Sequence, residues 1–179
     1  MTLYALCYPS LAEADDQFIR SYRDEHDLPY RDVVRHHFTM VFGIEDLDTD
    51  TFVDHVHSIA ESQKPIPFVC RYAMLGDDAE TDDYYVFLVP DEGFSEIALL
   101  HDRLYTGEFA RFHRIEIPYV PHIGIATIAD APRIKRLCDE LNRGDLEIAG
   151  TLSDITVSEY DGTKITDLNS FKFEGRRRQ

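Results

Sequence analysis

The sequence contains little that would mark a secreted, disulfide-bonded or membrane-spanning protein. Its three cysteines, Cys7, Cys70 and Cys138, form no disulfide framework and no CxxC metal spacing, and we interpret them as buried thiols in a reducing cytosol. The first apolar run ends at Pro9 with no basic segment before it, so it does not resemble a signal peptide. No run approaches the roughly 20 apolar residues of a membrane span. The sequence therefore predicts a cytoplasmic protein without a membrane partner.

Positive charge is also scarce. Eighteen Lys and Arg residues face 34 Asp and Glu residues, for a formal net charge of −16. Such a surface repels polyphosphate backbones at long range, which argues against a long nucleic acid as partner. A small nucleotide or a single RNA end could still enter a locally neutral cleft. Arg31 and Arg35 beside His36 form the one basic cluster near an apolar strand, and they either hold a phosphate or end a solvated loop. The arginines at 176–178 are more typical of a solubilising tail.

An apolar run at residues 38–42 is rich in strand-forming residues and ends at a glycine, so it predicts a β-strand. Successive side chains on a strand point to opposite faces. The apolar residues at even positions therefore share one face, while His37 and Thr39 share the other. A titratable ring beside a hydroxyl on one face is typical of a functional site.

A second histidine opens a second apolar strand at residues 121–128. It lies 85 positions further on (122 − 37). By the same alternation His122, Gly124 and Ala126 share one face, and Thr127, at an odd position, is expected to face away from His122. The second strand thus has a histidine but no hydroxyl two residues later.

The surroundings of the two strands also match. Residues 4–9 and 85–90 are both apolar strands that end at proline, at an offset of 81 (90 − 9). In each half a helix, the histidine strand, a second helix and further strand follow. We therefore expect one α+β domain of two pseudo-symmetric βαβ-type lobes, residues about 1–83 and 84–175, whose antiparallel sheets flank a central cleft. If a pseudo-twofold axis relates the lobes, His37 and His122 meet across that cleft.

Hydrophobic periodicity and end signals predict the remaining elements. The expected helices cover residues 12–27, 51–63, 94–105 and 131–142, and the expected strands lie near 3–9, 67–75, 84–90, 146–159 and 164–173. Thr49 or Asp50 is expected to cap the second helix, and Asp130 the fourth, with Pro132 in its first turn. The acidic stretch at 76–83 lacks the spacing of a calcium loop and predicts a solvated hairpin tip.

Eight histidines raise the question of a metal site. No H-x3-H, HExxH or HxD spacing occurs, so the sequence predicts no metal. We expect five of the histidines to be surface or inter-lobe residues, namely His26, His55, His57, His101 and His113.

The residues His37-Phe38-Thr39-Met40 resemble the H-x-[T/S]-hydrophobic motif of the 2H phosphoesterase superfamily, which includes 2′-5′ RNA ligase-like proteins and cyclic nucleotide phosphodiesterases. The stretch at 121–126 resembles the second copy of that motif, and the order of elements matches over about residues 3 to 170. Gly124 departs from the pattern because the family usually has Thr or Ser there.

The resemblance implies a metal-independent phosphoesterase without a cofactor, acting on a 2′,3′-cyclic phosphate in a small nucleotide or at an RNA end. His37 and His122 would act as acid and base, in an order that the sequence does not assign, and Thr39 would bind a phosphate oxygen. Gly124 offers only backbone and room at that site.

Further substrate contacts are expected from Arg35 or another nearby arginine, and from Tyr119 or another nearby tyrosine. The other arginines and tyrosines are Arg31, Arg111, Arg114, Tyr4 and Tyr8. The alternative hypothesis is a 2H-like module that binds a nucleotide or a protein without turnover. A third is an acidic scaffold protein that uses the fold only for its shape.

Overall fold

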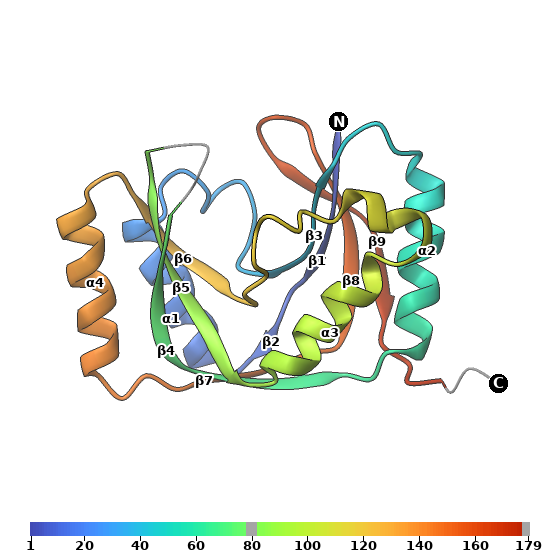
Figure 1. Cartoon of the computed structure of the whole chain (residues 1–179). Helices are drawn as coiled ribbons and strands as arrows, with labels where there is room; N and C mark the ends of the chain where they lie inside the picture. Colours follow the sequence, from blue (N-terminus) through green and yellow to red (C-terminus); the bar gives the residue numbers. More distant parts are fainter. Residues whose placement is uncertain (78–81, 177–179) are drawn as a thin grey trace.

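The computed structural model describes residues 1–77 and 82–176. The middle of the acidic stretch at 76–83 and most of the arginine tail therefore lie outside the described residues. Within them, the structure confirms an α+β fold with two antiparallel sheets (Figure 1).

The strands of the described residues form one sheet of four and one of five. The first sheet has the order β3 (Phe38–Ile44), β1 (Thr2–Cys7), β8 (Asp154–Tyr160) and β9 (Ile165–Lys172). The second has the order β2 (Ser10–Leu11), β7 (Ile148–Leu152), β4 (Ile66–Asp77), β5 (Tyr84–Glu92) and β6 (Ile123–Ile128). The histidine strands β3 and β6 are each at the end of a sheet, and each therefore has one backbone edge with no neighbouring strand among the described residues.

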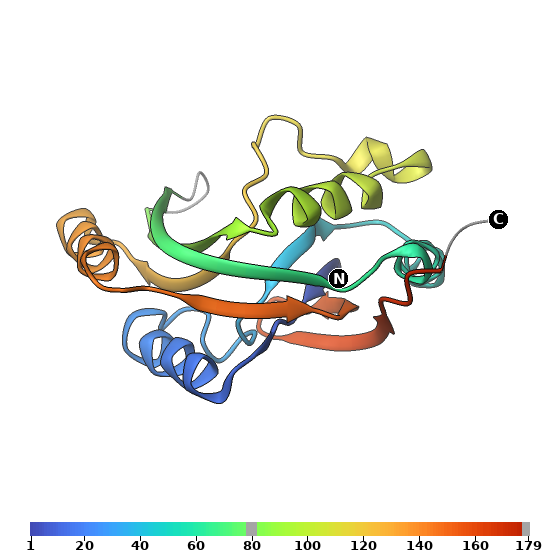
Figure 2. The same cartoon turned by 90° about the horizontal axis from the view of Figure 1, so that it is seen from below.

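In the described part of the chain, four α-helices and one short 3₁₀-helix accompany the sheets. They are α1 (Glu13–His26), α2 (Thr49–Ser62), α3 (Phe94–Leu104), α4 (Ala131–Arg143) and the 3₁₀-helix η1 (Gly107–Phe112). Helix α2 packs against β8 and β9, whereas α4 packs against β4, β5 and β6. Figures 1 and 2 show α1 and α4 at one end of the molecule and α2 at the other. Among the described residues, no helix is both long and apolar enough to span a membrane.

The two sheets do not coincide with two consecutive halves of the chain. Strand β4, from the first half, pairs with β5 in the second sheet, and β8, from the second half, pairs with β1 in the first sheet. The lobes expected at 1–83 and 84–175 are therefore interleaved. The physical reason is the β4–β5 hairpin, because two strands joined by a short connection pair most readily with each other.

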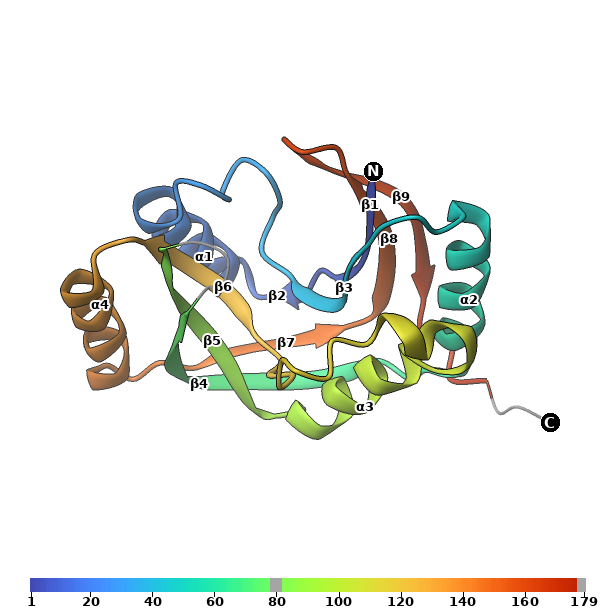
Figure 3. The ribbon, with the colours of Figure 1, turned by 45° about the horizontal axis from the view of Figure 1, so that its top comes forward.

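The helices are interleaved in the same way. Helix α1, which precedes β3 in the chain, packs against β6, and α3, which precedes β6, packs against β3. Figure 3 shows α1 beside β6, at the opposite end of the molecule from α2. Each histidine strand is thus packed against a helix from the other half.

Capping follows the expected chemistry with one shift in position. Asp130 caps α4 by accepting a hydrogen bond from the Arg133 amide at 2.9 Å, with proline in the first turn, as predicted. The cap of α2 is Asp48, which accepts from the Thr51 amide at 2.9 Å, and not Thr49 or Asp50. Helix α2 therefore begins two residues before the expected position 51, because a carboxylate one residue earlier reaches the free amides of the first turn.

The core joins the two sheets through an aromatic pair. Phe38 on β3 and Phe68 on β4 are both almost fully buried, and their rings meet edge to face with centroids 5.1 Å apart. All three cysteines are buried free thiols, as predicted. The strand that follows His37 therefore packs, through Phe38, against the second sheet.

We predict that Phe68→Ala lowers the free energy of unfolding by about 3–5 kcal/mol, because it removes a fully buried ring and leaves a cavity between the sheets. Urea denaturation measures this change. Phe18→Ala is the control, since Phe18 is 36% exposed on α1, and it should cost about 1 kcal/mol or less. Equal losses for the two variants would contradict the proposed place of Phe68 in the core.

Candidate functional site

The two histidines of the motif occupy equivalent positions. His37 directly precedes β3 and His122 directly precedes β6. In each, Nδ1 bonds the carbonyl oxygen two residues earlier, that of Arg35 at 2.8 Å and that of Val120 at 2.7 Å. A carbonyl oxygen can only accept, so Nδ1 of both rings carries the proton and Nε2 retains its lone pair. The backbone thus fixes the same histidine tautomer in both copies of the repeat.

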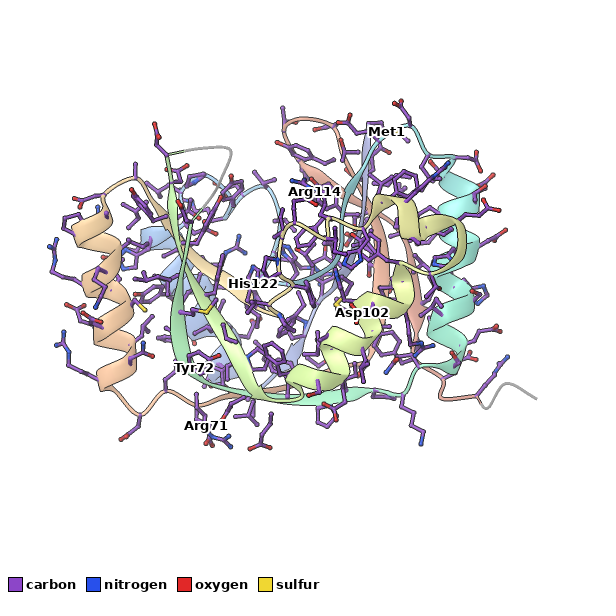
Figure 4. All side chains as sticks on the ribbon, viewed as in Figure 1. Met1, Arg71, Tyr72, Asp102, Arg114 and His122 are labelled. Atoms are coloured by element: carbon purple, nitrogen blue, oxygen red, sulfur yellow. The ribbon has the colours of Figure 1, made fainter. Side chains whose placement is uncertain are left out.

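Both rings are only partly exposed to solvent, and loss of hydration disfavours their charged forms. Loss of hydration lowers the pKa of His37 from 6.5 to about 4, and it also lowers the pKa of His122. Positive charge lowers the pKa of His37 further, that of Arg23 first and that of His122 after it. Figure 4 shows His122 near the middle of the molecule, between the ends formed by α4 and α2. In the unliganded protein both rings are therefore neutral at neutral pH.

Thr39 lies beside His37, as strand alternation predicts. Nε2 of His37 and Oγ1 of Thr39 are 3.2 Å apart, and because Nε2 is unprotonated the threonine hydroxyl donates this bond. The basic nitrogen and the hydroxyl therefore form a unit that a phosphate oxygen could enter by replacing their mutual hydrogen bond.

A β-bulge interrupts the alternation of side chains along β6, so residues beyond it point to the opposite face from the one expected. Gly124 pairs with Phe87, but the next regular pair joins Ala126 to Val86, so one residue of β6 is extra. Thr127 then pairs with Tyr85, which shares a face with Phe87. The expectation that Thr127 faces away from His122, with Ala126 beside it, is wrong, because simple alternation ends at the bulge.

The hydroxyl of Thr127 is nevertheless engaged elsewhere. It donates to the carboxylate of Asp27 at 2.7 Å, and both residues are buried. Asp27 also pairs with the buried guanidinium of Arg23 at 2.8 Å. Thr127 therefore fastens β6 to the end of α1 and does not supply the hydroxyl that Gly124 lacks.

The position of Gly124 is open. A Cβ built there has no atom within 4 Å outside the neighbouring residues. Phe87, which pairs with Gly124, stacks its ring on His122 with centroids 3.8 Å apart. Sequence reasoning missed Phe87, although its place on the strand that pairs with the second motif is a usable signal.

Arg35 and Tyr8 adjoin His37. The Arg35 guanidinium lies 3.6 Å above the centre of the Tyr8 ring and contacts the carboxylate of Asp167 at 3.4 Å, while the Tyr8 hydroxyl donates to Asp167 at 2.8 Å. Burial, reinforced by Asp167, raises the pKa of Tyr8 to about 12. The Tyr8 ring meets His37 edge-on with centroids 6.3 Å apart. Tyr8, Arg35 and Asp167 line a cavity of about 420 Å³ that continues over β8 and β9.

The basic cluster noted in the sequence belongs to a second pocket of about 480 Å³. Four arginines and two aspartates line it together with His36, and they are Arg20, Arg23, Arg31, Arg35, Asp16 and Asp24. Each of these arginines already pairs with a carboxylate, Arg20 with Asp16, Arg23 with Asp27, Arg31 with Asp32 and Arg35 with Asp167. Arg111 and Arg114 lie elsewhere, since Arg111 covers the ring of Phe112 and Arg114 pairs with Glu116.

Tyr119 has a clear structural contact. Its hydroxyl donates to the carbonyl oxygen of Thr39 at 3.0 Å, and its ring stacks parallel to that of His101 at 3.6 Å. One ring face is therefore covered, and any base would have to stack on the other.

The remaining histidines are mostly packed. His26 and His101 are buried, His55 stacks on Phe109 at 3.9 Å, and exposed His57 stacks on Phe171 at 4.7 Å. One group of possible metal ligands occurs among the described residues, formed by His101, Asp102 and His113. The sequence spacing did not reveal it.

We predict that His37 stays neutral down to a pH of about 4 in the free protein, and that inorganic phosphate raises its pKa because an anion favours the charged ring. Imidazole proton NMR measures both values. The unfolded chain takes up this proton first, near 6.5, so the contribution of neutral His37 to stability is complete above pH 6.5 and is lost as pH falls towards 4. Titration near 6.5 in the folded protein would contradict the described burial.

Comparison with known proteins agrees with this geometry. Among solved structures, TT0787 of Thermus thermophilus aligns with a TM-score of 0.63 and 17% identity, covering 99% of this chain and 100% of its own. E. coli LigT complexed with ATP aligns at a TM-score of 0.56 and 14% identity, covering 96% of this chain and 97% of its own. Usb1 of Kluyveromyces marxianus aligns at a TM-score of 0.56 and 9% identity, covering 93% of this chain and 97% of its own. These likenesses show the fold.

No curated protein matches the chain. The model of the 2′-5′ RNA ligase superfamily, however, matches residues 9–164, a range that includes both histidine motifs. The resemblance to 2H phosphoesterases is thereby confirmed, and the chain belongs to the 2′-5′ RNA ligase superfamily.

Proposed function

We propose that the protein opens a 2′,3′-cyclic phosphate, or a related small cyclic phosphodiester, by acid–base catalysis between His37 and His122. The observation that carries this proposal is the shared tautomer, because both rings are fixed through Nδ1 to a carbonyl and keep Nε2 for the reaction. Each copy of the repeat thus contributes one such nitrogen, that of His37 and that of His122.

The reaction needs one neutral and one protonated ring. The neutral ring takes a proton from the attacking water as the new oxygen–phosphorus bond forms. The protonated ring gives its proton to the ribose oxygen as the bond from that oxygen to phosphorus breaks. Each turnover leaves the proton on the opposite ring, and exchange with solvent restores the starting state. No metal or cofactor is required at phosphorus in this scheme.

The low pKa values suit this scheme once substrate binds. In the free protein burial favours two neutral rings. A phosphodiester anion between them adds a negative charge in a poorly hydrated place, which raises the pKa of both rings and lets one accept a proton. Substrate would thus create the acid that its own cleavage requires.

The substrate-binding groups follow from the same neighbourhood. Thr39 would donate its hydroxyl to a non-bridging phosphate oxygen after releasing Nε2 of His37, and Arg35 would add positive charge. On the other side, Gly124 leaves room for water or a bulkier substrate group. Tyr119 would stack a base on the ring face that His101 does not cover.

Relatives support a small nucleotide as ligand. LigT of E. coli has been crystallised with ATP, NADP+, 3'-AMP and phosphate. For the present protein we propose the same class of ligand, a compact phosphate-bearing nucleotide or RNA end. A long nucleic acid would meet the repulsion of a surface with net charge −16.

The competing proposal is a module that binds a nucleotide or protein without turnover. Gly124 favours it, because the second hydroxyl of the motif is absent and one stabilising contact to the transition state is lost. The two proposals differ in one measurable respect, the formation of an opened product.

We predict that wild type opens a 2′,3′-cyclic nucleotide in the presence of chelator, with a bell-shaped pH dependence, and that His37→Ala and His122→Ala each lower the rate about 100-fold or more. A panel of cyclic mononucleotides and a short RNA with a cyclic phosphate end, followed by chromatography, measures the rate.

The matched control for the histidine variants is His57→Ala, since His57 is exposed and stacks on Phe171. It should keep full activity. Nucleotide binding with no product at any pH would instead establish the binding module.

We predict that Gly124→Thr raises kcat/KM relative to Gly124→Val by about tenfold or more, the effect expected of one hydrogen bond to a charged oxygen. A Cβ at position 124 meets no atom within 4 Å outside its chain neighbours, so the position has room for a side chain. Thr and Val have nearly the same shape, so their comparison isolates the hydroxyl. Equal rates would show that this position does not contact the phosphate.

A further inference from the structure

Three potential metal ligands meet where α3 ends. His101 and Asp102 lie in the last turn of α3, and His113 directly follows η1, twelve positions later (113 − 101). One ligand atom from each residue lies within 4.8 Å of the other two. In the catalytic scheme above, none of the three acts on the substrate.

The buried imidazole of His101 is held in one orientation. Its Nδ1 bonds the carbonyl oxygen of Met40 at 2.9 Å, so Nδ1 carries the proton and Nε2 keeps a free lone pair. Its ring stacks on that of Tyr119 with the planes parallel and the ring centroids 3.6 Å apart. Only 1% of His101 is exposed. A ring nitrogen held by a backbone carbonyl, with the other nitrogen free, is the arrangement typical of a metal-binding histidine.

His113 offers the second nitrogen at a suitable angle. Its ring stacks on Tyr105, and its centroid lies 5.5 Å from that of His101, with the planes 70° apart. A tetrahedral ion about 2.0–2.1 Å from each nitrogen would hold two imidazole centroids roughly 5 Å apart. The described residues include no hydrogen-bond partner for the ring nitrogens of His113 or for Nε2 of His101.

Asp102 adds a negative charge at the surface. It is exposed, and no hydrogen bond among the described residues uses its carboxylate. Figure 4 shows Asp102 on α3 and Arg114 above it, near the top of the molecule. The positive charge of Arg114 is partly offset by its ion pair with Glu116.

We propose that Nε2 of His101, His113 and the carboxylate of Asp102 bind a divalent transition-metal ion of the Zn²⁺ type. A set of two imidazoles and one carboxylate favours Zn²⁺ over Ca²⁺ or Mg²⁺, because Ca²⁺ and Mg²⁺ prefer all-oxygen sites. Water would complete the tetrahedron. The ion has no part in the reaction at phosphorus.

The position of this site gives the ion a structural role. His101 is bonded to β3 through Met40, one residue from Thr39, while His113 begins the segment that leads to His122. An ion shared by His101 and His113 would fasten that segment to α3 and so hold the supports of both motif histidines together. It would raise thermal stability by binding only the folded state.

Cobalt provides the test, because Co²⁺ in a tetrahedral site has visible d–d absorption. Chelator-treated full-length protein is titrated with Co²⁺ alone. We expect bands that saturate at one ion per chain, no thiolate charge transfer because the cysteines are buried, displacement by Zn²⁺, and a rise in Tm with Zn²⁺. His113→Ala and Asp102→Asn should each weaken binding at least about tenfold, the lower range for perturbing a metal site.

The variants avoid the buried His101, whose replacement could prevent folding. His57→Ala is the matched control and should bind Co²⁺ as wild type does. Absence of tetrahedral bands in wild type, or unchanged binding in both His113→Ala and Asp102→Asn, would overturn the site. Loss of cyclic phosphodiester opening on chelation, well below Tm, would overturn the structural role. The Co²⁺ titration needs no turnover, so it is independent of the proposed reaction.

Discussion

The open backbone edge of β3 is the constraint on which the site depends. Strand β3 is the outermost strand of its sheet, and its unpaired polar groups need partners away from water. Side chains from the α3 region supply them, since His101 donates to the Met40 carbonyl and the Tyr105 hydroxyl accepts from the Phe42 amide at 2.9 Å. The strand that carries Thr39 is therefore held by side chains from the other half of the chain.

The other histidine strand is fastened in a reciprocal way. Thr127 of β6 donates to Asp27, which follows α1 and pairs with Arg23. Burial raises the pKa of Asp27 even though Arg23 and Thr127 oppose the shift, which shows how strongly this contact is withdrawn from water. Each motif strand is therefore tied to a helix that precedes the opposite strand, so the two halves of the chain support each other's histidine.

Parts of this arrangement could be predicted from the sequence because they depend on local periodicity. The contact between His37 and Thr39 follows from alternation along a regular strand. The same rule failed at Thr127, because a bulge in β6 is set by pairing with β5, a partner that periodicity does not describe. The interleaving of the sheets and the group formed by His101, Asp102 and His113 were missed for a related reason, since both arise from contacts between distant parts of the chain.

The charge distribution bears on the anionic substrate proposed above. A net charge of −16 repels phosphate at a distance, but this repulsion is screened over roughly 8 Å at physiological salt. Within that range the local charges matter most, and the pocket beside His36 gathers four arginines, although each of them already pairs with a carboxylate. A compact ligand with one or two phosphates fits inside the screened zone, whereas a long polyanion must cover the acidic surface as well. The proposed nucleotide ligand is therefore compatible with the acidic surface, whereas that surface disfavours an extended nucleic acid.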